Sequence, residues 1–69
     1  MNTYAILSRK TPAIGKAISG KLIEKDGNNL SLQSWHTSIV REIKLIAQIS
    51  QKTIYAVKTK NSVYTVIVL

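Results

Sequence analysis

The sequence predicts an all-β fold, namely a small antiparallel barrel of five or six strands, SH3-like or OB-like. The residue types that suit a pleated, half-buried surface (Ile, Thr, Val, Tyr and Trp) supply 25 of the 69 residues. Short apolar runs alternate with turn residues at intervals of about 8–12 residues, which is typical of such folds. The chain is long enough for one domain, spanning residues 1–69, and too short for two.

The first two strands are expected at residues 3–9 and 16–25. Pro12 ends the first strand, because it lacks a backbone N–H group for the ladder and restricts the residue before it. Gly20 interrupts the second strand. A glycine inside a strand pattern indicates a bulge or the close approach of another backbone.

The strongest turn signal is the run Asp-Gly-Asn-Asn at residues 26–29, which leads into a return strand at residues 30–36. A four-residue loop here places Gly20 opposite Trp35, and an aromatic ring across from a strand glycine is a stabilising pair. The two leucines of the return strand share one face, and Trp35 falls on the other.

Residues 37–51 fit two structures. In a strand, alternate apolar residues share one face: Ile39, Ile43, Leu45, Ala47 and Ile49. In a helix capped by Ser38, Leu45 and Ile49 fall outside the apolar stripe. Period two fits better and isoleucine favours strands, so we expect a strand with a bend or bulge.

The last segment predicts an antiparallel hairpin with a two-residue turn at residues 60–61. With this turn, Val57 lies opposite Tyr64. Two residues further along, Tyr55 lies opposite Val66, so one face is apolar and aromatic. We therefore expect both tyrosines to pack in the core.

The C-terminal run at residues 62–69 has high β propensity and no charged side chain. Such a segment aggregates when it is left as an open edge. We expect it to pair with the first strand or with a second copy of the chain, and it is also a candidate edge for a protein partner.

The charge is the main functional signal. Ten Lys and Arg residues against three Asp and Glu residues give a net charge of +7. This charge attracts polyanions, nucleic acid among them, although scattered lysines also keep small β-proteins soluble. Trp35 serves either as a stacking platform for a base or as the cover of the opposite glycine. The candidate nucleic-acid-binding residues are Arg9, Lys10, Lys16, Lys21, Lys25, Trp35, Lys58 and Lys60.

Catalytic and metal chemistry are not expected. A set of Ser34, His36 and Asp26 would come from one hairpin and lacks a nucleophile elbow and an oxyanion hole. Without cysteine or a second histidine, a zinc site lacks ligands. The glycine–lysine pairs do not have the spacing of a phosphate-binding loop. We therefore expect no enzyme activity, no metal and no cofactor.

The sequence also suggests a location and a source. It holds no apolar run near the roughly 18 residues of a membrane span and no signal peptide at its start, so we expect a cytoplasmic protein without a membrane partner. Eight lysines against two arginines, with ten isoleucines, indicate an AT-rich genome such as that of a low-GC bacterium, phage or plasmid.

Two stretches in the second half of the chain follow a recurring pattern: T-S-x-V-x-x-I at residues 37–43 and T-x-N-S-x-Y at residues 59–64. The pattern resembles small uncharacterised bacterial and phage β-proteins. The resemblance implies an SH3-like barrel and a strand at residues 39–49, and it implies no activity.

Two classes of function follow. The first is a non-enzymatic basic module that binds nucleic acid or another polyanion through a lysine-bearing face. The alternative is a phage- or plasmid-encoded protein-interaction module, an inhibitor or adaptor, that acts through an edge strand or surface contact. A small domain without disulfides builds a small core, so self-association into a homo-oligomer through an edge strand is a further possibility.

Overall fold

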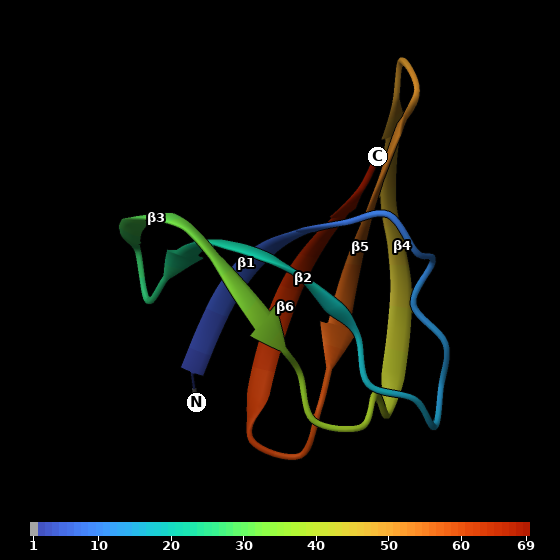
Figure 1. The fold of residues 1–69 in the computed structure, drawn as a ribbon. Coiled ribbons are helices and arrows are strands. Elements are labelled where there is room, and N and C mark those ends of the chain that lie inside the picture. The colour runs from blue at the N-terminus through green and yellow to red at the C-terminus, as the bar shows by residue number, and fades with distance from the viewer. Residues whose placement is uncertain (1) are drawn as a thin grey trace.

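Six strands build one mixed sheet with the order β3-β2-β1-β6-β5-β4. The computed structural model describes residues 2–69, without the side chains of Leu30 and Ser31. The prediction of an all-β fold with five or six strands is confirmed. The strands are β1 (Asn2–Ser8), β2 (Ser19–Lys25), β3 (Asn28–His36), β4 (Glu42–Ile49), β5 (Lys52–Lys58) and β6 (Ser62–Val68) (Figure 1).

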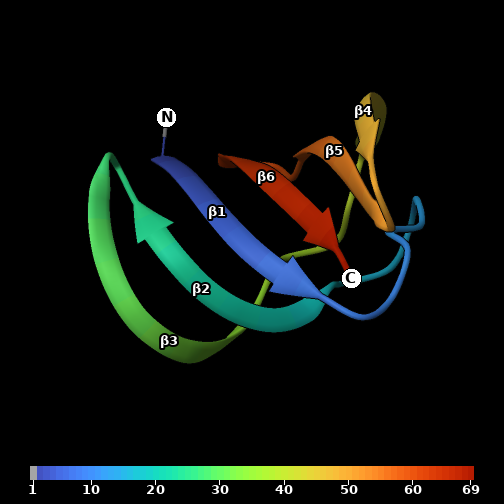
Figure 2. The ribbon, with the colours of Figure 1, turned by 90° about the horizontal axis from the view of Figure 1, so that it is seen from above.

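The sheet consists of two antiparallel three-stranded meanders, β1-β2-β3 and β4-β5-β6, joined by a parallel pairing of β1 with β6. Seen from above, it curves from β3 at one end to β4 at the other (Figure 2). Within residues 2–69, β3 and β4 are the outer strands and do not pair with each other. The predicted closed, antiparallel barrel is therefore wrong. Local alternation specifies each hairpin, whereas the direction of a pairing between the two ends of the chain leaves no local signal.

The core lies on the concave side of the curved sheet. Two irregular connections, residues 9–18 and 37–41, contribute Ile18 and Val40 to it. These segments cover the core where the sheet does not close on itself. The remaining buried hydrophobic side chains come from the strands, namely Ile6, Leu22, Val57, Tyr64 and Val66.

The β2–β3 connection is a two-residue turn, Asp26-Gly27, and not the predicted four-residue loop. Both residues have positive φ (49° and 84°), which tight turns of this kind require and which Asp-Gly readily adopts. A register shift further along the hairpin compensates for the shorter loop. Gly20 therefore lies opposite Trp35, as predicted.

Trp35 marks the face of β3 that meets the core. Its ring packs partly buried against the core cluster, whereas Leu32 is 61% exposed. The prediction for Leu30 concerns a side chain that lies outside those described. In the sequence, the alternation of Leu30 and Leu32 indicates the apolar face of this strand. In the structure, the side chain that packs against the core is that of Trp35.

The strand interpretation of the ambiguous segment is confirmed for β4, which carries the expected bulge at Ile46. Before the bulge, Leu45 lies opposite Tyr55; after it, Ala47 lies opposite Ile54. One extra residue reverses the alternation of faces. The prediction that Leu45 and Ala47 share one face is therefore wrong.

The C-terminal hairpin has the predicted register, with Val57 opposite Tyr64 and Tyr55 opposite Val66. The Thr59 N–H donates to the carbonyl of the residue after the two-residue turn at 3.0 Å. On its other side β6 pairs with β1, so the expected pairing with the first strand is confirmed. The prediction that residues 62–69 offer an open edge is wrong, because β6 is a central strand.

Candidate nucleic-acid interface

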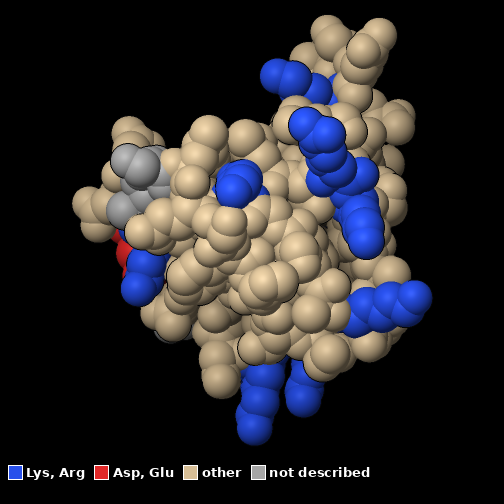
Figure 3. Space-filling view, in the orientation of Figure 1, with Lys and Arg blue, Asp and Glu red and all other residues tan. Residues whose placement is uncertain are grey.

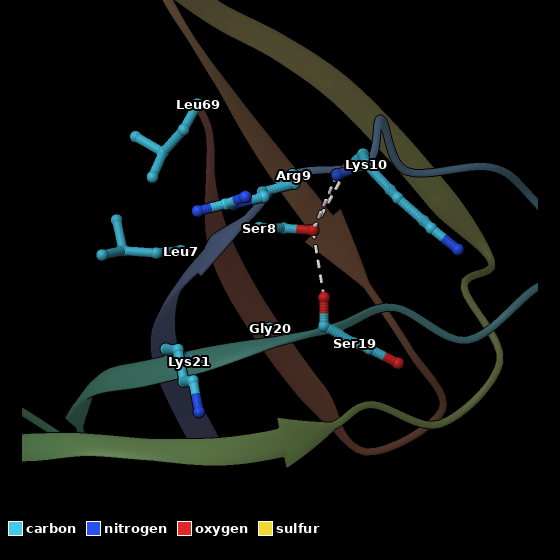
Figure 4. A pocket seen from close by; sticks show the side chains of 8 residues that line it. All are labelled: Leu7, Ser8, Arg9, Lys10, Ser19, Gly20, Lys21 and Leu69. Carbon is cyan, nitrogen blue, oxygen red and sulfur yellow. Dashed lines mark hydrogen bonds between the residues drawn. The ribbon is translucent and has the colours of Figure 1, made fainter.

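The connection between β1 and β2 brings four of the expected cations to one side of the molecule. We call this set the loop surface: Arg9, Lys10 and Lys16 from the connection, and Lys21 from β2, all exposed. The loop surface borders two adjoining hollows, which share Lys10 and Ser19. The first hollow has a volume of about 480 Å³ (Figure 4) and the second about 290 Å³.

Hydrogen bonds fix the backbone that carries these cations. The Gly15 N–H donates to the Val40 carbonyl at 2.9 Å, and the Val40 N–H donates to the Lys16 carbonyl at 3.0 Å. The Thr37 N–H donates to the Ile18 carbonyl, and the Thr37 hydroxyl accepts the Ile18 N–H, both at 2.9 Å. Gly15 has φ +86°, which suits glycine. The basic connection is therefore held against residues 37–41.

Ser8 lines the first hollow and hydrogen-bonds to the two residues that line both hollows, Lys10 and Ser19. Its hydroxyl is buried, donates to the Ser19 carbonyl at 3.0 Å and accepts the Lys10 N–H at 3.1 Å. Its carbonyl accepts the Leu69 N–H at 2.9 Å. The ends of β1, β2 and β6 therefore meet at one residue, through its hydroxyl and its backbone carbonyl. Ser8 is not among the residues predicted to have a role, although continuing the alternation of β1 from Ile6 places it on the core face.

Among the described side chains, none of the three acids forms an ion pair with a cation of the loop surface. Glu24 and Asp26 belong to the far end of β2 and its turn, and Glu42 lies 3.7 Å from the Lys58 ammonium. Neither hollow is lined by an acidic residue. Figure 3 shows Lys and Arg side chains on the right, where the β1–β2 connection lies, and also at the bottom, the centre and the left edge, while Asp and Glu are visible only at the left edge. The positive charge of the loop surface is therefore not neutralised locally.

The other expected cations lie toward the end of the sheet opposite to Arg9 and Lys10. Lys16 lies between the two groups, since the Val40 N–H donates to its carbonyl and the next N–H, that of Arg41, donates to the Lys58 carbonyl. Lys25 ends β2, Lys58 ends β5 and Lys60 lies in the β5–β6 turn, whereas Arg9 follows the far end of β1. The ion pair of Lys58 is exposed and contributes little stability. The structure thus divides the predicted set into two groups, and only the loop surface borders the two hollows.

Trp35 is not placed with the cations. Its ring centroid lies 5.3 Å from that of Tyr4, and its Nε1–H donates to the Tyr64 hydroxyl at 3.3 Å. The Tyr4 and Tyr64 rings stack with centroids 4.9 Å apart. These three rings pack on the core side, and no aromatic side chain lines either hollow.

The residues weighed for catalysis do not converge. His36 Nδ1 hydrogen-bonds to the Ser19 hydroxyl at 2.9 Å, and the Ser34 hydroxyl accepts a hydrogen bond from Lys21 at the same distance. The Asp26 carboxylate instead accepts a hydrogen bond from the Thr3 N–H of β1 at 2.9 Å. Among the described residues, no group of three His, Asp or Glu side chains could hold a metal ion, and no helix is long and apolar enough to cross a membrane.

Comparison of the chain with protein-family models, curated proteins and solved structures gives no match. Function is therefore inferred from the geometry and charge of the loop surface.

Proposed function

We propose that this protein is a non-enzymatic basic module that binds nucleic acid through the loop surface. The observation that carries the proposal is the grouping of four exposed cations on a hydrogen-bonded backbone, around two adjoining hollows that no acidic residue lines. Such a surface neutralises successive phosphates and gains free energy from the release of condensed counterions.

The proposal distinguishes the loop surface from net charge alone. If charge acted only from a distance, any two lysines would contribute equally to binding. If phosphates contact the loop surface, Lys10 and Lys16 matter more than Lys25 and Lys60, which are exposed and line neither hollow.

The test compares two double variants of equal charge. Lys10→Gln with Lys16→Gln alters the loop surface, and Lys25→Gln with Lys60→Gln is the matched control. Each is titrated by fluorescence anisotropy against labelled single-stranded and duplex oligonucleotides at low and physiological salt.

We expect the loop-surface variant to lose about tenfold or more in affinity at low salt, and the control variant to bind nearly as the parent protein does. An equal loss in both variants, or no salt-dependent binding by the parent protein, contradicts the proposal. Heparin competing as well as nucleic acid would identify a general polyanion site.

A second candidate function is protein interaction through β4. This strand is an outer strand of the sheet, and its side chains Leu45, Ile46 and Ile49 are 55–60% exposed. An apolar edge strand is a template for pairing with another chain, whether a second copy or the target of a phage- or plasmid-encoded inhibitor or adaptor. The edge offered for such pairing is that of β4, since β6 is already paired on both sides.

A further inference from the structure

The first hollow combines apolar walls with a planar cation. Leu7 of β1 and Leu69 beyond β6 supply the apolar side chains, and the guanidinium of Arg9 points between them (Figure 4). Lys21 of β2 also lines the hollow, with its ammonium turned toward the neighbouring strand β3 (Figure 4). Gly20 lines the hollow with its backbone alone. No other residue fits here, because a Cβ at this position would collide with the Leu7 carbonyl oxygen.

The Arg9 guanidinium is the group best placed to meet a ligand here. Among the described side chains it forms no hydrogen bond or ion pair, whereas the Lys21 ammonium donates to the Ser34 hydroxyl at 2.9 Å. A guanidinium is flat, weakly hydrated and able to stack on π-faces, which an ammonium is not. The backbone around it is fixed by the buried Ser8 hydroxyl.

We propose that the first hollow receives one unstacked base of a single-stranded nucleic acid. The face of the base lies on the Arg9 guanidinium between Leu7 and Leu69, and the flanking phosphates meet Lys10 and Lys21. This inference rests on the proposed function and deepens it. The volume of about 480 Å³ lies within the usual range for small-ligand sites.

Single-strand selectivity follows from this geometry. Bases in a duplex are paired and stacked on each other, so their faces cannot enter the hollow, whereas a single strand can turn one base outward. Arginine planes serve as stacking partners for unpaired bases, and here they replace the aromatic platform, since Tyr4, Trp35 and Tyr64 are used on the core side.

The experiment separates base contacts from phosphate contacts. A labelled short single strand is compared by anisotropy with a strand of the same length made of abasic sites, which keeps every phosphate, and with a duplex. The variants are Arg9→Lys, which keeps the charge and removes the plane, and Leu69→Ser, at a position 55% exposed. Circular dichroism confirms that each variant is folded.

We expect the intact strand to bind at least about fivefold more tightly than the abasic strand, the lower end of base-stacking contributions in single-strand binding. Arg9→Lys and Leu69→Ser should each reduce this ratio and leave abasic binding unchanged. Equal affinity for intact and abasic strands, or a ratio that both variants leave unaltered, overturns the base pocket while the loop surface stands. Absence of salt-dependent binding to all three probes overturns the loop surface and the pocket together.

Discussion

Trp35 donates a hydrogen bond from Nε1 to the Tyr64 hydroxyl at 3.3 Å, although β2 and β1 lie between their strands in the sheet. The contact is made across the concave side, so it depends on the curvature of the sheet. Tyr4, on one of the intervening strands, packs against both rings. The aromatic cluster therefore links the two meanders.

Substitution of Trp35 is expected to affect stability and not binding. Trp35→Ala should lower the free energy of unfolding by about 3 kcal/mol, since a partly buried indole and its hydrogen bond are lost. Trp35→Phe keeps a ring and should cost less. Urea denaturation followed by circular dichroism measures both, because the variants lack the single tryptophan. A variant with unchanged stability and lost nucleic-acid affinity would instead make the ring a binding platform.

Gly20 is expected to tolerate no side chain. A Cβ there would meet the backbone of Leu7, and backbone cannot move aside as a flexible side chain can. Gly20→Ala should therefore destabilise the protein by about 2 kcal/mol, as overpacking typically does. Ser19→Ala, at the neighbouring exposed position, is the control and should change the stability little. Equal midpoints of urea unfolding for the two variants would contradict this account.

Much of the fold could be predicted because its hairpins are local. The alternation at residues 55–66 predicts every cross-strand pair of the last hairpin. Gly20 lies opposite Trp35 as predicted, but through a shorter turn and a register shift that offsets it. The bulge at Ile46 and the two-residue turn at Asp26 change the register by single residues, which hydrophobic patterns do not resolve.

The candidate site could be predicted only in part. Charge alone identified the cations, but the sequence gives no reason to group Arg9, Lys10, Lys16 and Lys21 apart from Lys25, Lys58 and Lys60. That grouping follows from the parallel β1–β6 pairing and from hydrogen bonds between two irregular connections, both of which join residues far apart in the chain. The first hollow also depends on Leu69 meeting β1, again a long-range contact.

In the turn between β2 and β3, substitution of Gly27 should lower the stability of the protein, and substitution of Asp26 by asparagine should change it little. Gly27 has φ +84°, a conformation that alanine adopts only with strain, so Gly27→Ala should cost about 1 kcal/mol. Asparagine adopts positive φ readily and can still accept the Thr3 N–H, so Asp26→Asn should be nearly neutral. Thermal unfolding by circular dichroism compares the two, and a larger loss for Asp26→Asn would contradict this order.

Association through the β4 edge should be abolished by a charge at the bulge. Ile46 is 55% exposed on an outer strand, so Ile46→Lys should leave the fold intact while opposing pairing with another chain. Leu32→Lys, similarly exposed on the other outer strand, is the matched control. Light scattering over a range of concentrations should show association in the parent and in Leu32→Lys, and none in Ile46→Lys. Association that persists in Ile46→Lys would exclude this edge as the interface.

Single cations should differ in the salt dependence of binding. Lys16 lies on the loop surface and Lys60 in the β5–β6 turn, and both are exposed, so neither substitution by glutamine should disturb the fold. If Lys16 contacts a phosphate, Lys16→Gln should reduce the slope of log affinity against log salt by about 0.7 for a single strand, the value expected for one lost phosphate contact. Lys60→Gln should leave the slope unchanged, because Lys60 lines neither hollow. Equal slopes for the two variants would mean that the phosphates do not meet the loop surface at Lys16.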